Sequence, residues 1–121
     1  MPNPVTWFEI IGNDPIKLQQ FYRNVFNWKL GEPVADMGNY SILDHEEKGI
    51  GGGVGGSMEG GPPSRVTIYI EVDDPQAYLD KATQAGGQVL MPVMQVTEGV
   101  VIAMFADPGG NAIGLLKSNP T

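Results

Sequence analysis

The most constraining feature of this sequence is an internal repeat with an offset of sixty residues. Residues 7–15 align with residues 67–75, and both stretches read as an apolar strand that runs into an Asp-Pro pair. The carboxylates of Asp14 and Asp74 can each accept a bond from a free N–H of a first helical turn, and the following prolines suit the first helical position. Two helices therefore begin at equivalent places, which favours a duplicated structural unit.

The two predicted helices carry apolar stripes of unequal strength. The second stripe is sparse, with Tyr78, Ala82 and Ala85. The helices end near Asn27 and at Gly86-Gly87, residue types that tolerate the left-handed backbone of a helix C-cap. The first stripe follows the i, i+3, i+4, i+7 spacing of one buried face and consists of Leu18, Phe21, Tyr22 and Val25.

Each helix is followed by three further predicted strands. The first of them begin at Lys29-Leu30 and Val89-Leu90, and the next cover residues 38–43 and 99–104, where the offset has grown to sixty-one. Turn-forming residues at 44–49 and 107–111 then predict hairpins into the last strands. In the first half the last strand is the glycine run of residues 49–56, which indicates close approach of another chain segment to the backbone.

Each half thus reads as strand, helix, strand, strand, strand. The sequence predicts an α+β fold in which two βαβββ modules, residues 5–56 and 65–117, form one domain over residues 1–121. A Gly/Pro linker at residues 57–64 joins the modules. Neither half is long enough to bury its sheet alone, so the modules are expected to share a core within one chain or between chains. We therefore expect a homodimer.

Composition and charge narrow the classes of partner. Fourteen acidic and seven basic side chains give a net charge of −7, which disfavours nucleic acid and anionic membrane surfaces. No apolar run approaches the roughly 20 residues of a membrane span, and the first residues lack the features of a signal peptide. The chain has no cysteine, which excludes thiolate chemistry. We expect a cytoplasmic protein.

Several short motifs occur in a characteristic order along most of the chain. The first half contains Trp7-Phe8-Glu9-Ile10 and, at residues 21–28, Phe-Tyr-Arg-Asn-Val-Phe-Asn-Trp; the second contains Val-Asp-Asp at 72–74, Ala-Gly-Gly at 85–87 and Asp-Pro-Gly-Gly-Asn at 107–111. Together they resemble the vicinal oxygen chelate superfamily, which includes glyoxalases, bleomycin-resistance proteins and extradiol dioxygenases. The resemblance implies that the two modules form a cup-shaped, eight-stranded mixed sheet.

The resemblance also implies where a metal would be held. Metal-using members place a His, Gln or Glu on the first strand of each module and a carboxylate on the last. The matching positions here are Trp7, Thr67 and Gly114, and the remaining one falls near Gly53. The chain is therefore identified as a glyoxalase-like member that lacks the usual metal ligands, and we expect neither a metal nor another cofactor. His45, the single histidine, is expected in a solvated turn.

Strand alternation selects the side chains that would face a ligand. If Phe8 and Ile10 face their helix, Trp7 and Glu9 face the opposite side of the first strand. By the same alternation, the first strand of the second module presents to that side Thr67, Tyr69 and Glu71. A carboxylate on a central strand can act as a general base or bind a ligand amine, unless water or a basic side chain occupies it. Trp7 and Tyr69 are equally typical of residues that fill a hydrophobic core. The candidate catalytic residues are Glu9 and Glu71, and the candidate ligand-binding residues are Trp7, Thr67, Tyr69, Met104 and Gly114.

Three functions remain open on these grounds. The first is a metal-independent cup that binds a small, apolar or aromatic molecule. The second is a lyase, isomerase or dioxygenase-type enzyme with Glu9 or Glu71 as base or atypical metal ligand. The third is a structural or regulatory partner domain with no ligand.

Overall fold

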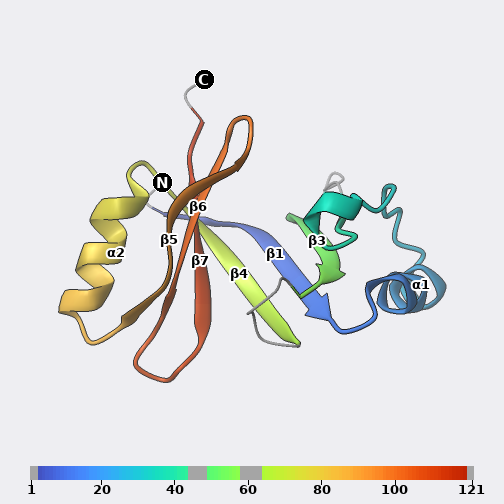
Figure 1. The fold of residues 1–121 in the computed structure, drawn as a ribbon, viewed down its shortest axis with the longest axis horizontal. Helices are drawn as coiled ribbons and strands as arrows, with labels where there is room; N and C mark the ends of the chain where they lie inside the picture. The colour runs from blue at the N-terminus through green and yellow to red at the C-terminus, as the bar shows by residue number, and fades with distance from the viewer. Residues whose placement is uncertain (1–2, 44–48, 58–63, 120–121) are drawn as a thin grey trace. The chain divides into compact units, whose positions relative to one another are not determined.

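The structure is a computed structural model that describes residues 3–43, 49–57 and 64–119. It divides into an N-terminal unit, Trp7–Thr67, and a C-terminal unit, Met1–Thr6 with Ile68–Thr121, and each is described in turn. Within the described ranges there are two α-helices and seven strands (Figure 1). In chain order the elements are β1 (Val5–Gly12), α1 (Pro15–Phe26), the 3₁₀ turn η1 (Ala35–Met37), β2 (Ser41–Leu43), β3 (Gly51–Gly56), β4 (Arg65–Val72), α2 (Pro75–Gln84), β5 (Gln88–Thr97), β6 (Val100–Ala106) and β7 (Ala112–Lys117).

Both helices begin where the repeat predicts. The Asp14 carboxylate accepts a bond of 3.1 Å from the Lys17 N–H, and the Asp74 carboxylate accepts one of 3.4 Å from the Ala77 N–H. A proline opens each helix. Asn27 ends α1 with a left-handed φ of 58°. The predicted helix starts and the first helix end are confirmed, because local backbone chemistry decides them.

In the N-terminal unit, β3 pairs in parallel with β1 and antiparallel with β2. The strand expected at Lys29-Leu30 is reduced to an isolated bridge between Leu30 and Leu43. Pro33 lacks a backbone N–H and follows closely, so the pairing cannot continue along the chain. The described residues consequently form seven strands, and the prediction of eight is not met.

The face that α1 presents to its sheet differs from the predicted apolar stripe. Phe21 and Val25 are 54% and 53% exposed, whereas Gln19 is completely buried. The amide of Gln19 donates to the carbonyl oxygens of Asn39, at 2.6 Å, and Val54, at 2.8 Å. These two bonds satisfy the amide nitrogen of the buried side chain, whereas its Oε1 atom has no hydrogen-bond partner among the described residues. The helix is therefore oriented by a glutamine, which a search for apolar spacing does not detect.

In the C-terminal unit the strand order is β4-β7-β6-β5, with β4 and β7 parallel and the other pairs antiparallel. Helix α2 packs on β5, β6 and β7 (Figure 1). The core consists of Val72, Leu79, Ala103 and Leu115, each at most 2% exposed. Alternation along β4 explains this core, because Val72 and the neighbouring Ile70 lie on the side that α2 covers.

The predicted hairpin between β6 and β7 is confirmed. The Asp107 carboxylate accepts bonds of 2.9 Å from the N–H groups of Gly109 and Asn111, and the side-chain amide of Asn111 donates to both of its oxygens. These donors, the Asn111 side chain foremost, lower the pKa of Asp107 below its ordinary value of 3.8. The ionised carboxylate therefore stabilises the turn.

Several expectations concern residues outside the described ranges. His45 and most of its predicted turn lie there, as does Met58–Pro63 of the predicted linker. The module boundaries and the cup stay predictions. Neither helix in the described ranges is long and apolar enough to cross a membrane.

Candidate functional site

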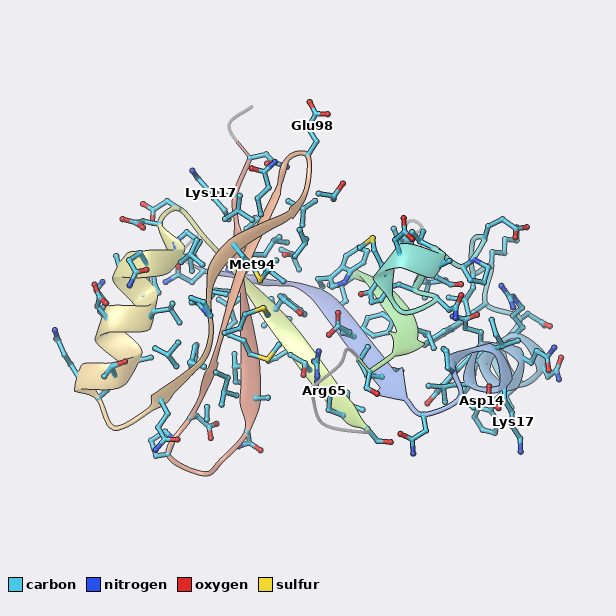
Figure 2. The ribbon with its side chains drawn as sticks, viewed as in Figure 1. Asp14, Lys17, Arg65, Met94, Glu98 and Lys117 are labelled. Carbon is cyan, nitrogen blue, oxygen red and sulfur yellow. The ribbon has the colours of Figure 1, made fainter. Side chains whose placement is uncertain are left out.

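In the N-terminal unit, two candidate residues contact a cation, Arg65, that sequence reasoning missed. Arg65, the first residue of β4, places Nη2 at 2.7 Å from the Glu9 carboxylate on β1. Its Nη1 donates to the Thr67 hydroxyl, also at 2.7 Å. Glu9 is 8% exposed and Thr67 is 1% exposed, while the Arg65 side chain retains 20%. Figure 2 labels Arg65 and shows its side chain on β4. The guanidinium is thus held in place with part of it open to solvent.

Trp7 is joined to a second residue that sequence reasoning missed. Its indole N–H donates to the Tyr40 hydroxyl at 3.0 Å. Both side chains are half-buried. Because Trp7 and Glu9 lie on the same face of β1, the indole–phenol pair and the Arg65–Glu9 pair share that face. This group of Trp7, Glu9, Tyr40, Arg65 and Thr67 is called the Arg65 group below.

The glycine run of β3 makes room for these aromatic rings. The Tyr40 ring fills the space that a side chain would need at Gly53 and also lies against Gly55, and the Trp7 ring stands 2.8 Å from where a Cβ would be at Gly51. All of β3 is buried. The expectation of close approach to this backbone is confirmed, and the Tyr40 ring lies over Gly53, near which the resemblance predicts a carboxylate position.

The C-terminal unit contains the corresponding arrangement. Tyr69 on β4 pairs in register with Gly114 on β7, and its ring fills the space that a side chain would need at position 114. Met104 on β6 lies opposite Gly114 in the next pair of strands. Tyr69 is 4% exposed and Met104 is 6% exposed. The structure therefore brings these three candidate residues together, as the Tyr69 group, at Gly114, where the resemblance predicts a second carboxylate position.

Glu71 lies two residues beyond Tyr69 on the same face of β4 and is half-buried. Its backbone N–H donates to the Pro4 carbonyl oxygen at 2.8 Å. Among the described residues its carboxylate forms no ion pair, in contrast to that of Glu9. Of the two candidate bases, Glu71 is therefore the one whose carboxylate is not occupied by a cation of the described chain.

Among residues 3–43, 49–57 and 64–119, acidic and histidine side chains do not gather at either group. No cluster of three or more His, Cys, Asp or Glu residues suited to a metal occurs in the part of the chain that the structure describes. The donors near Arg65 are a carboxylate already paired with a cation and a hydroxyl already hydrogen-bonded. These residues do not fit the oxygen and imidazole set that a divalent metal requires.

Each missed residue had a detectable signal. Arg65 is two residues before Thr67, so strand alternation alone places it on the same face. Tyr40 is the only aromatic residue in the predicted strand of residues 38–43, and a run of glycines needs a bulky partner across the sheet. Their contacts with Glu9 and Trp7 also depend on the register between strands, which neither strand alternation nor the glycine run reveals.

Each unit has the α+β architecture in which a helix covers one face of a mixed sheet. The opposite face of each sheet carries aromatic and charged side chains. The Glyoxalase/Bleomycin resistance protein/Dioxygenase superfamily profile matches residues 5–115. The chain belongs to this superfamily.

Relatives by sequence are longer proteins. The chain is 32% identical over 118 residues to CFP32 of Mycobacterium bovis, which is named, provisionally, as a glyoxylase. It is 27% identical over 133 residues to the anthracycline biosynthesis protein DnrV of Streptomyces peucetius. These matches cover 93% and 96% of this chain but 45% and 47% of the relatives. The chain thus spans about half the length of the curated relatives it matches.

Solved structures show the same fold at lower sequence identity. The hypothetical protein BH1468 from Bacillus halodurans matches with a TM-score of 0.70 at 15% identity, covering 100% of this chain and 98% of that one. The methylmalonyl-CoA epimerase from Mycobacterium tuberculosis matches with a TM-score of 0.67 at 16% identity, covering 96% of this chain and 88% of that one. At these identities the likeness concerns the fold alone.

Proposed function

We propose that this protein binds a small apolar or aromatic molecule without a metal ion, using the Arg65 group as its principal contact surface. One observation carries the proposal. Tyr40 and Tyr69 fill the side-chain space at Gly53 and Gly114, the positions where metal-using relatives of this fold are expected to hold carboxylates. These positions would then hold aromatic rings in place of metal ligands. The half-buried Tyr40 and Trp7 rings also offer flat apolar surface, which is typical of sites for small organic molecules.

The polar part of the Arg65 group would orient such a ligand. A guanidinium has five N–H donors, and the contacts to Glu9 and Thr67 use only part of them. The remaining donors can bind a carbonyl or acidic oxygen of the ligand while its apolar part contacts the Trp7 indole. Because Glu9 and Thr67 hold the guanidinium in advance, little side-chain entropy is lost on binding.

The names of the relatives support a small organic ligand. CFP32 is named as a glyoxylase and DnrV as an anthracycline biosynthesis protein, and both names refer to the chemistry of small molecules. For this chain, these names support only the class of ligand.

The second candidate is a lyase, isomerase or dioxygenase-type enzyme. The position of Glu71 favours it, because a half-buried carboxylate without an ion pair to the described chain can accept a proton from a ligand. Glu9 is the weaker candidate base, since its carboxylate is paired with Arg65. The homodimer, the cytoplasmic location and the lack of nucleic acid and membrane partners stay predictions.

Metal analysis and ligand binding separate these functions. Purified protein should contain far less than one Fe, Mn, Ni or Zn per chain, and aromatic acids should raise the melting temperature and quench the Trp7 emission in a Trp28→Phe background. Arg65→Met should weaken binding of the acids. Lys17 is an exposed cation on α1 (Figure 2), so Lys17→Met should not weaken it.

Stoichiometric metal that is lost with activity in Glu9→Gln would overturn the proposal. No shift across apolar, aromatic and cationic libraries would favour a partner domain without a ligand.

A further inference from the structure

The C-terminal unit contains a cavity on the opposite face of β4 from the Tyr69 group. Its volume is about 410 Å³, which is within the usual range for small-ligand pockets. It lies between α2 and the sheet, and its apolar surface comes from Ile70, Val72, Phe105 and Leu115. Since Ile70 and Val72 alternate with Tyr69 and Glu71 along β4, the cavity lies on the other face of this strand from the Tyr69 group.

The cavity exists because α2 presents small side chains at this place. Ala82 and Ala85 line the helix side, whereas Leu79, one turn earlier, is buried to 2% exposure and fills its part of the interface. The chain thus leaves a space where a leucine at position 82 would restore ordinary packing. Such a space is filled at little cost by an apolar group of the right size.

The rim of the cavity carries a positive charge next to this apolar interior. Lys81 lines the cavity, and its Nζ lies 4.6 Å from the centroid of the Tyr78 ring. Within the described residues Lys81 forms no ion pair. Asp107 also lines the rim, but its carboxylate is engaged by the N–H groups of its own turn. The ammonium therefore remains available to an anion.

We propose that this cavity binds a small amphipathic monocarboxylate, with its apolar chain against Ile70, Phe105 and Leu115 and its carboxylate at the Lys81 ammonium. A single cation at the rim complements a single negative charge. A phosphate dianion is disfavoured, because one ammonium balances only part of its charge and the whole chain carries a net charge of −7.

Octanoate and octanol are suitable probes, because they share the apolar chain and differ in the anionic head. Octanoate should bind the wild-type protein, and it should raise the melting temperature more than octanol at the same concentration. Lys81→Gln should weaken octanoate binding by about two- to fivefold, as expected for a partly exposed ion pair. The same substitution should leave octanol binding unchanged. Equal loss for both probes would exclude the role of the ammonium.

Ala82→Leu tests the cavity itself. It should remove binding of both probes, while the circular dichroism spectrum stays that of the folded protein. Lys81→Glu is a surface change that tests the same site if Ala82→Leu does not fold. It should abolish octanoate binding and create binding of octylamine, whereas Lys17→Glu on α1 should do neither.

Two results would overturn this proposal: the lack of octanoate binding at low millimolar concentration, or octanoate binding that survives both Ala82→Leu and Lys81→Glu. Its failure is distinguishable from that of the proposed function. Ligands of the Arg65 group are followed by the Trp7 emission, and octanoate at the α2 cavity should leave that emission unchanged.

Discussion

The ring of Tyr69 occupies the space above Gly114, so any side chain at position 114 would overlap it. Position 114 is where the metal-using members of this fold are expected to place a carboxylate of the second module. The neighbouring strand β4 fills this space with an aromatic side chain. A glutamate placed there would have to displace a residue that is 4% exposed.

Gly114→Ala should lower the free energy of unfolding by about 1–3 kcal/mol, the usual cost of overpacking a buried site. Gly114→Glu should be more destabilising and should bind no metal. Gly31→Ala is the matched control, because a Cβ at that position would lie 3.7 Å from the Ile42 carbonyl oxygen, an ordinary contact. Urea denaturation measures both. If Gly114→Ala is as mild as Gly31→Ala, the ring does not lie over the glycine.

The Arg65–Glu9 contact should be measurable as a coupling energy. In a double-mutant cycle of Arg65→Met and Glu9→Gln we expect a coupling of about 0.5–1 kcal/mol, since both side chains keep some solvent exposure. The coupling should decrease as salt is added. A cycle of Lys17→Met with Glu9→Gln is the control and should be additive. Additivity in the Arg65 cycle would argue against a persistent ion pair.

Gln19 should control the position of Tyr40 through the backbone next to it. Gln19→Met removes the donors to the Asn39 and Val54 carbonyl oxygens and should cost about 1–3 kcal/mol. It should also shift the indole N–H resonance of Trp7, which donates to Tyr40. Tyr40→Phe should shift the same signal. The chain has two tryptophans, so the Trp28 resonance serves as the control. A loss of stability with an unchanged Trp7 resonance would indicate that Gln19 acts only on packing.

The turn between β6 and β7 should give a defined pH dependence. The pKa of Asp107 is lower in the folded chain than its ordinary value of 3.8, chiefly because of the Asn111 side chain. Its ionised form therefore adds stability above that pH and loses it as the pH falls through the folded pKa. Asp107→Asn should destabilise the protein at neutral pH, and the difference from the wild type should shrink below about pH 3.8. A difference that does not change between pH 7 and pH 3 would contradict this role.

Features decided by neighbouring residues were predictable from the sequence. Asp14 and Asp74 start helices because each carboxylate bonds an N–H three residues later. Asp107 forms its turn because all its donors come from the next four residues. The alternation of β4 likewise identified the faces of Tyr69 and Val72 correctly, since a strand has a fixed period of two.

The tertiary structure alone decided what those faces contact. The α1 stripe was predicted incorrectly, because buried bonds from Gln19 to two distant carbonyls outweigh apolar spacing. The predicted strand at Lys29-Leu30 shrank to one bridge, because pairing depends on a partner with matching donors. Arg65 and Tyr40 belong to the candidate site because they contact Glu9 and Trp7, which are 56 and 33 residues away in the sequence. Such pairings follow from the register between segments that are distant in the sequence, and no local pattern encodes that register.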